Sequence, residues 1–219
     1  MVSITLVIPC YKPHLQKLLR LLDSVNNQTR LPDNVIISCS STLPGDLPSF
    51  PSYCFNYTLI VSDKRANAAE NRNRAARLAT TTDYISFIDA DDIMHEQRIE
   101  LICKIIETKG AEFIMHSYHT QDELTIPFEK YENVQFDIGK LYKAPSLCAA
   151  HIDGLHIRLH HSQATVSRRV FELVGGYNEN KEAERREDAL FCGVCLSQPI
   201  TNGYIPVPLT KYDYAGYWE

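Results

Sequence analysis

Two hydrophobic periods alternate along the first half of the chain. Short apolar runs bounded by turn residues predict buried strands, and longer segments with apolar residues at every third or fourth position predict helices. The predicted strands cover residues 4–9, 34–41, 58–61, 84–88 and 111–118, and the predicted helices cover residues 14–28, 67–79 and 95–110. This alternation predicts βαβ units, and therefore an α/β fold with a mostly parallel central sheet flanked by helices.

The pattern becomes irregular beyond about residue 120. Here we predict a short helix that ends at Gly175 and Gly176, a second helix over residues 187–197, and an extended segment over residues 203–214. The chain has no internal repeat, low-complexity tract or linker. A single domain over residues 1–219 is therefore expected, and this length is sufficient to bury a substantial core.

The stretch YISFIDADDIM, residues 84–94, ends a predicted buried strand with the three carboxylates of Asp89, Asp91 and Asp92. Ligands of an open parallel sheet bind beyond the carboxyl ends of its strands. Alternation along an extended chain places Asp89 and Asp91 on one side, where a hard divalent cation would find oxygen ligands. The alternative is an exposed turn with Asp91 or Asp92 capping the next helix, but a cap uses only one acid. We therefore favour a metal site.

Two reaction classes use an Asp-x-Asp motif at a strand end. In haloacid-dehalogenase-like phosphatases the first carboxylate, here Asp89, is the nucleophile, but that motif normally follows the first strand and here three strands precede it. In nucleotide-sugar transferases the motif binds Mn²⁺ or Mg²⁺ together with the diphosphate of the sugar nucleotide. A third interpretation is a non-catalytic domain that binds sugar nucleotides.

Composition narrows the range of partners. A net charge of -5 argues against a nucleic-acid partner. No apolar run approaches the ~18 residues that span a bilayer, and the N-terminal residues resemble a strand more than a signal peptide. The seven cysteines are scattered, which indicates reduced thiols and a cytoplasmic location. Cys192 and Cys195 form a C-x-x-C pair, but no second pair completes a zinc site, so we expect core thiols.

Several segments, taken in order, resemble family 2 glycosyltransferases of the GT-A fold. The segments are LVIPCYKP at 6–13, the Arg72-Asn73 pair, YISFIDADD at 84–92, SRRVFELVGGYNE at 167–179 and RREDALF at 185–191. Asn73 stands 16 residues before Asp89, and Ala75 is the small residue that this family carries after its Arg-Asn pair. The resemblance implies that residues 1–118 bind the nucleotide sugar and that residues 119–219 bind a glycan or glycoconjugate acceptor.

The resemblance also implies roles for individual residues. Asp91 would ligate Mn²⁺ or Mg²⁺, with Asp89 contacting the ribose or the metal. The residues implied to bind the sugar nucleotide are Pro9, Tyr11, Ser38, Ser40, Lys64, Arg72, Asp89 and Ala90. Asp188, beside Glu187, matches the family's base, and a single carboxylate that deprotonates the acceptor opposite the leaving group implies inversion at the anomeric carbon. An alternative for these two acids is a helix start whose dipole favours negative charge.

One departure from the family concerns the nucleotide. Members usually carry an acid at the end of the second strand that recognises the base, whereas this chain has Ser38 and Ser40 in the stretch SCSS. The base identity is therefore left open. A third metal ligand is also left open between Asp213 and the histidines of the stretch HIDGLHIRLHHSQ, for which lining a pocket or supporting structure is favoured. These histidines, grouped around Asp153, are His151, His156, His160 and His161.

Overall fold

The computed structural model describes residues 1–120, 123–143, 149–152, 155–158 and 164–213. Its main sheet has nine strands among these residues, in the spatial order β3-β2-β1-β4-β11-β6-β12-β5, with β7 paired to β12. The strands are β1 (Ile4–Tyr11), β2 (Asn34–Ser40), β3 (Tyr57–Val61), β4 (Tyr84–Phe87), β5 (Ile93–Met94), β6 (Phe113–His119), β7 (Asp137–Ile138), β11 (Thr165–Ser167) and β12 (Asn202–Lys211). Strands β1 to β4 are parallel, and so are β6 and β12, whereas β11 runs antiparallel to both β4 and β6.

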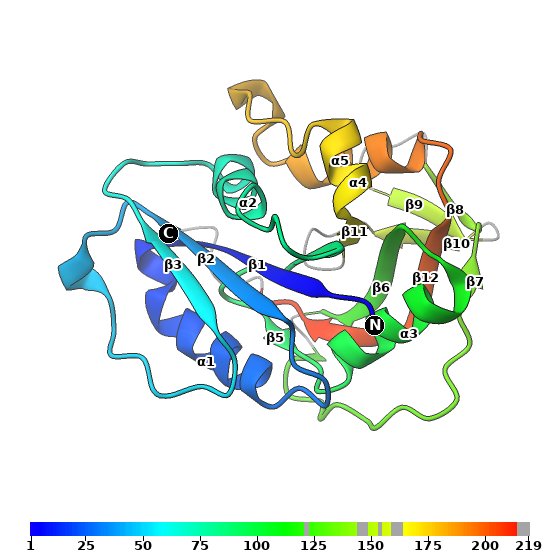
Figure 1. Ribbon diagram of the computed structural model, residues 1–219, viewed down its shortest axis with the longest axis horizontal. Helices are drawn as coiled ribbons and strands as arrows, with labels where there is room; N and C mark the ends of the chain where they lie inside the picture. The colour runs from blue at the N-terminus through cyan, green and yellow to red at the C-terminus, as the bar shows by residue number, and fades with distance from the viewer. Residues whose placement is uncertain (121–122, 144–148, 153–154, 159–163, 214–219) are drawn as a thin grey trace.

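Helices cover both faces of this sheet (Figure 1). One face packs against α1 (Leu15–Asn26) and α3 (Arg98–Lys109), which carry the larger apolar cluster. The other face packs against α2 (Ala68–Ala76), α4 (Arg168–Val174) and α5 (Glu187–Leu196). Short 3₁₀ helices occupy Lys12–His14, Pro44–Asp46 and Lys181–Ala183. The result is one α/β domain with a mostly parallel sheet between two helical layers, as the sequence pattern predicts.

Strand β1 contributes apolar side chains to both faces of the sheet. Ile4, Leu6 and Ile8 belong to the cluster under α1 and α3, while Val7 belongs to the cluster under α2. The strand continues through Pro9, two residues beyond the predicted end. β4 pairs with β1 only as far as Val7, so no neighbouring strand on that side requires an amide hydrogen from Pro9.

The predicted strands and helices of the first half are all present, but the third helix begins later than predicted. It starts at Arg98 instead of residue 95, because Ile93–Met94 pairs with the end of β12 as strand β5. The Nδ1 atom of His95 then accepts a hydrogen bond from the Gln97 amide at 2.9 Å. Gly110 ends the helix with a φ of 67°, which a residue without a Cβ adopts readily.

The sequence pattern misses the short strands of the second half. Strand β11 was not predicted, nor was a small antiparallel sheet of β8 (Leu141–Lys143), β9 (Ala149–Ile152) and β10 (Leu155–Arg158). Strands of three or four residues have too few positions to establish a period of two. No helix in the described part of the chain is long and apolar enough to cross a membrane.

Candidate active site

The loop after β4, which we call the acidic loop, carries the three acids Asp89, Asp91 and Asp92, and all three are buried. Asp89, Asp91 and Asp92 are 6%, 1% and 0% exposed. An exposed turn is therefore wrong as an account of this motif. Capping by Asp92 is also wrong, because α3 begins at Arg98 and its N-cap residue is Gln97. Ala90 lies between the first two acids and is itself 1% exposed. Buried carboxylates need nearby cations, and the loop has several.

Arg72 of α2 connects Asp89 to the first residue of α5. Its Nη2 atom donates to Asp89 Oδ1 at 2.9 Å, and its Nη1 atom donates to Glu187 Oε1 at 3.1 Å. The guanidinium is 1% exposed and lies 5.3 Å from the ring centroid of Tyr177. Burial by itself lowers the pKa of Arg72, but the charges around it, Asp89 foremost, outweigh burial and raise the pKa overall. Arg72 is therefore a fixed positive charge shared by two carboxylates.

Helix α2 is folded so that three consecutive polar side chains point inward. A capping box between Asn67 and Glu70 starts the helix, and Asn71, Arg72 and Asn73 are each no more than 3% exposed. These three side chains contact different parts of the protein: the ends of β1 and β2, the acidic loop, and the segment around Tyr177. Resemblance singled out only the Arg-Asn pair. A run of polar residues on every face of an otherwise alanine-rich helix is the signal that would have added Asn71.

At the end of β2, the two serines belong to a buried network. Ser40 Oγ accepts from Asn71 Nδ2 at 2.8 Å, and Ser38 Oγ accepts from Arg74 Nε at 2.7 Å. Asn71 Nδ2 also donates to the carbonyl of Cys10 at 3.3 Å. The polar contacts that these serines were expected to offer a nucleotide are thus made to other protein groups. Arg74 places a positive charge beside the position where family members usually carry an acid.

Lys64 is exposed, and it lines a hollow of about 390 Å³ beside α2. The residues around this hollow are Ser62, Lys64, Arg65, Ala66, Glu70, Arg74, Arg77 and Glu179. Pro9 and Tyr11 lie in the last part of β1, and the Tyr11 ring contacts the His14 ring with centroids 4.3 Å apart.

Asp91 lies beside His14, a histidine that none of the sequence motifs includes. His14 Nδ1 and Asp91 Oδ2 are 3.5 Å apart, and both side chains are at most 8% exposed. Burial lowers the pKa of His14, as does Lys17, against the opposing charges of Asp89 and Asp213. His14 Nε2 is buried and makes no hydrogen bond among the described residues. The Asp91 carboxylate, beside an imidazole whose Nε2 atom makes no such hydrogen bond, suits a divalent cation that also binds phosphate oxygens.

A larger ligand set is not found. Within the described ranges, no group of three or more His, Cys, Asp and Glu side chains is arranged to hold a metal ion. Asp213, one of the expected third ligands, instead pairs with Arg20 at 2.7 Å and with Lys17 at 3.5 Å. His151 and His156 are backbone partners in β9 and β10. Their side chains, and residues Asp153, His160 and His161, lie outside the described part.

Asp188 and Glu187 form the first turn of α5. Glu187 is 8% exposed, and its Oε2 atom is buried without a hydrogen-bond partner among the described residues. Asp188 is partly exposed, and its Oδ1 atom accepts from the Ala189 amide at 2.7 Å. The helix N-terminus stabilises both negative charges. Of the pair, Glu187 thus faces the acidic loop through Arg72, while Asp188 retains some access to solvent.

The C-x-x-C pair is structural, as predicted. Cys192 and Cys195 are both fully buried in the apolar cluster beneath α5. Burial raises the pKa of the Cys195 thiol to about 12, and it raises the pKa of Cys192 as well.

Comparison with known proteins identifies the family. Residues 5–173 match the family model described as glycosyl transferase family 2. The chain belongs to this family. Amylovoran biosynthesis glycosyltransferase AmsB of Erwinia amylovora is 32% identical over 111 residues, which cover 48% of this chain and 36% of AmsB. O-antigen chain rhamnosyltransferase WbaN of Salmonella anatum is 25% identical over 187 residues, which cover 82% of this chain and 57% of WbaN.

The fold of this family 2 chain is that of solved glycosyltransferases. S. aureus TarS in complex with UDP-GlcNAc superimposes with a TM-score of 0.67 at 13% identity, over 99% of this chain and 60% of TarS. The mannosyltransferase PcManGT from Pyrobaculum calidifontis, in complex with GDP-Man and Mn²⁺, gives a TM-score of 0.61 at 16% identity, over 98% and 58% of the two chains. The chain thus spans less than two thirds of each of these relatives.

Proposed function

We propose that this chain transfers one sugar from a nucleotide-diphosphate sugar to a hydroxyl group of a glycan or glycoconjugate. The observation that carries the proposal is the buried guanidinium of Arg72, which binds both Asp89 of the acidic loop and Glu187 of the α5 N-terminus. It brings a candidate donor site into one charge network with Glu187, the neighbour of the candidate base Asp188. Family membership and the fold both favour transfer over the phosphatase alternative.

The donor would bind at the ends of β1 and β4. In this proposal Tyr11 and Pro9 would border the nucleotide, and Asp89, Ala90 and Asp91 would lie on the side of the diphosphate. Arg72 is committed to two carboxylates, so we assign it the role of holding Asp89 in place, and direct contact with the diphosphate falls to other groups. Residues 1–118 contribute this donor side, and residues 119–219 contribute the acceptor side.

A divalent cation, Mn²⁺ or Mg²⁺, fits the donor chemistry of Asp91 with Asp89 and His14 nearby. When bound, it would neutralise the charge that develops on the departing diphosphate. With so few protein donors, phosphate oxygens of the donor and water would complete its coordination. Asp91 is the residue in this chain that we expect to hold it.

Asp188 would act as the base. It takes the proton of the acceptor hydroxyl while the acceptor oxygen forms a bond to the anomeric carbon and the nucleoside diphosphate leaves with the bonding electron pair. A single displacement from the face opposite the leaving group inverts the configuration at that carbon. Glu187, held by Arg72, would fix the first turn of α5 so that its neighbour Asp188 presents its carboxylate to the acceptor.

The test is a thermal-shift panel of UDP-, GDP- and dTDP-sugars, each with and without Mn²⁺. We expect at least one donor to raise the unfolding temperature in a metal-dependent way, and Asp91→Asn to abolish that dependence. Stabilisation by none of them would refute the proposal. Asp63→Asn, which changes an exposed loop acid, is the matched control.

Turnover separates the remaining alternatives. Asp188→Asn should keep donor binding and lose transfer, and normal transfer by this variant would reject the base assignment. Binding without transfer by the unmodified chain would indicate a non-catalytic domain. Phosphate release with a phosphorylated Asp89 would indicate the hydrolase.

A further inference from the structure

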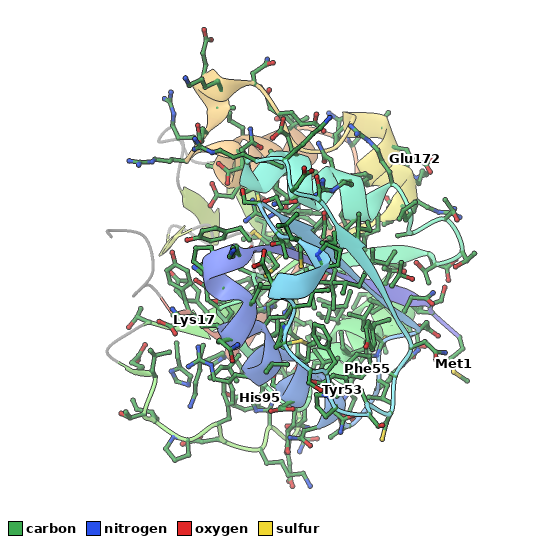
Figure 2. The ribbon with its side chains drawn as sticks, turned by 90° about the vertical axis from the view of Figure 1, so that its left-hand side faces the viewer. Met1, Lys17, Tyr53, Phe55, His95 and Glu172 are labelled. Carbon is green, nitrogen blue, oxygen red and sulfur yellow. The ribbon has the colours of Figure 1, made fainter. Side chains whose placement is uncertain are left out.

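Helix α1 and the residues just before it carry a row of basic side chains that faces the acidic loop. His14, Lys17 and Arg20 are spaced three residues apart, so they lie along one side of the helix. Figure 2 shows Lys17 on α1, with Tyr53 and Phe55 of the loop before β3 on the other side of the helix in that view. The buried face of α1 is apolar and consists of Leu15, Leu18, Leu21, Leu22 and Val25.

Arg20 joins two segments that are far apart in the sequence. One nitrogen, Nη2, donates to the backbone carbonyl of Asp91 and to the Asp213 carboxylate, each at 2.7 Å. The first contact fixes the peptide of the acidic loop, and the second fixes Asp213, two residues beyond the end of β12. Lys17 Nζ adds a weaker contact to Asp213 at 3.5 Å.

Asp213 closes this arrangement from the other side. Its backbone amide donates to Asp92 Oδ1 at 3.1 Å, so Asp213 contacts the loop through its main chain and α1 through its side chain. It is only 6% exposed, although it lies at the end of the described chain. A buried carboxylate in contact with two cations and an acidic loop differs from an ordinary surface ion pair.

We propose that Arg20 and Asp213 are positioning residues that hold the acidic loop in the shape that binds the sugar nucleotide. We call Arg20, Asp213 and the loop atoms that they bind the clasp. This inference rests on the proposed function, because it says that the clasp increases the affinity for the sugar-nucleotide donor. The clasp fixes the Asp91 carbonyl and the Asp92 carboxylate, and therefore the backbone on the C-terminal side of the Asp91 side chain. Neither residue contacts the reacting atoms in this assignment.

The first measurement is donor binding by calorimetry with whichever nucleotide sugar stabilises the unmodified chain. We expect Arg20→Ala and Asp213→Asn each to weaken binding about tenfold or more, and to raise KM for the donor with a smaller change in kcat. The double variant should lose little beyond either single one, because both break one clasp. Arg30→Ala is the matched control: its side chain also donates to a backbone carbonyl, of Val2 at 2.6 Å, and pairs with Glu107 at 3.4 Å.

The second measurement needs no donor. Hydrogen–deuterium exchange of the peptides that cover residues 89–94 and 211–213 should accelerate in Arg20→Gln and Asp213→Asn, but not in Arg30→Ala. Unchanged exchange together with unchanged donor affinity would overturn the clasp. The two measurements separate the two possible failures. If the unmodified chain binds no sugar nucleotide while the exchange rates still change, the proposed function fails, and with it the link between the clasp and donor affinity. If the chain binds a sugar nucleotide but neither the exchange rates nor the affinity change in the variants, only the clasp fails.

Discussion

The side-chain amide of Asn73 hydrogen-bonds both backbone groups of Tyr177. Tyr177 N donates to Asn73 Oδ1 at 2.8 Å, and Asn73 Nδ2 donates to the Tyr177 carbonyl at 2.8 Å. This pairing joins α2 to the segment between α4 and α5, 104 residues away. It requires that the backbone at Gly176 come close to Asn73, which gives the two adjacent glycines different roles.

We predict that Gly176→Ala is far more damaging than Gly175→Ala. Both glycines have positive φ, 79° and 78°, so alanine costs about 1–2 kcal/mol at either one. A Cβ at Gly176 would also lie 2.6 Å from Asn73 Oδ1, whereas at Gly175 it would meet nothing within 4 Å. The overlap should cost a further ~1–3 kcal/mol. Urea unfolding of the two variants measures the difference, and equal losses would contradict it.

Removing the shared cation should strongly destabilise the protein. Arg72→Met leaves Asp89 and Glu187 buried without their counter-charge, and we expect a loss of about 3–5 kcal/mol in the free energy of unfolding. Arg77→Met on the same helix is the control, because its pair with Glu179 at 2.9 Å is largely exposed and should contribute less than about 1 kcal/mol. A triple variant, Arg72→Met with Asp89→Asn and Glu187→Gln, should be more stable than Arg72→Met alone. If it were not, unpaired buried charge would not be the cause of the loss.

Asp83 should make a pH-dependent contribution to stability. Hydrogen bonds from the Ser3 hydroxyl and amide, at 2.7 and 3.1 Å, lower its pKa in the folded protein. Because the pKa is lower in the folded state, Asp83 stabilises the folded protein at pH values above its unfolded pKa of about 3.9. This stabilisation is lost as the pH falls through the folded pKa. Asp83→Asn should therefore cost stability at pH 7, by less than about 1 kcal/mol because the site is exposed, and nothing near pH 2. Thermal unfolding of the unmodified chain and of Asp83→Asn at both pH values measures the difference, and an equal loss at pH 2 and pH 7 would contradict the prediction.

The described cysteines should differ in reactivity. Cys54 is exposed, whereas burial raises the pKa values of Cys103 and Cys195 to about 12. At pH 8 only about one in ten thousand of those two thiols is ionised, and the thiolate is the nucleophile that reacts with alkylating reagents. Mass spectrometry after brief alkylation should find Cys54 modified, and Cys103 and Cys195 modified only in denaturant. Rapid labelling of Cys195 in the folded protein would contradict its burial.

The elements that the sequence predicts well are those with long hydrophobic patterns. Strand β1 and helix α1 each carry enough apolar positions to reveal both their type and their buried face. The position of Asp89 at a strand end was predictable for the same reason, because the apolar run before it is long enough to indicate a buried strand. Strand β11 has only three residues, and its position between β4 and β6 depends on contacts that no local pattern encodes.

Side-chain partners were harder to predict than positions. The resemblance placed Arg72 near the donor, but the sequence does not indicate that its two nitrogens are used by Asp89 and Glu187, which lie 17 and 115 residues away. Asp213 was a candidate metal ligand, yet the cations that bind it come from α1. The spacing of His14, Lys17 and Arg20 was visible in the sequence and would have pointed to a charged partner for this side of the helix.

The order of strands constrains how the chain can fold as it is synthesised. β4 and β6 are separated in the sheet by β11, and β6 receives its other neighbour, β12, only from Asn202–Lys211. When the ribosome has released residues 1–118, the centre of the sheet still lacks two interior strands, and both flanking edges are open. The acidic loop likewise lacks its hydrogen bond from the Asp213 amide until Asp213 has been translated, 121 residues after Asp92. A nascent chain should therefore depend on protection from edge pairing until β12 emerges, and the loop acquires its final shape in the same step.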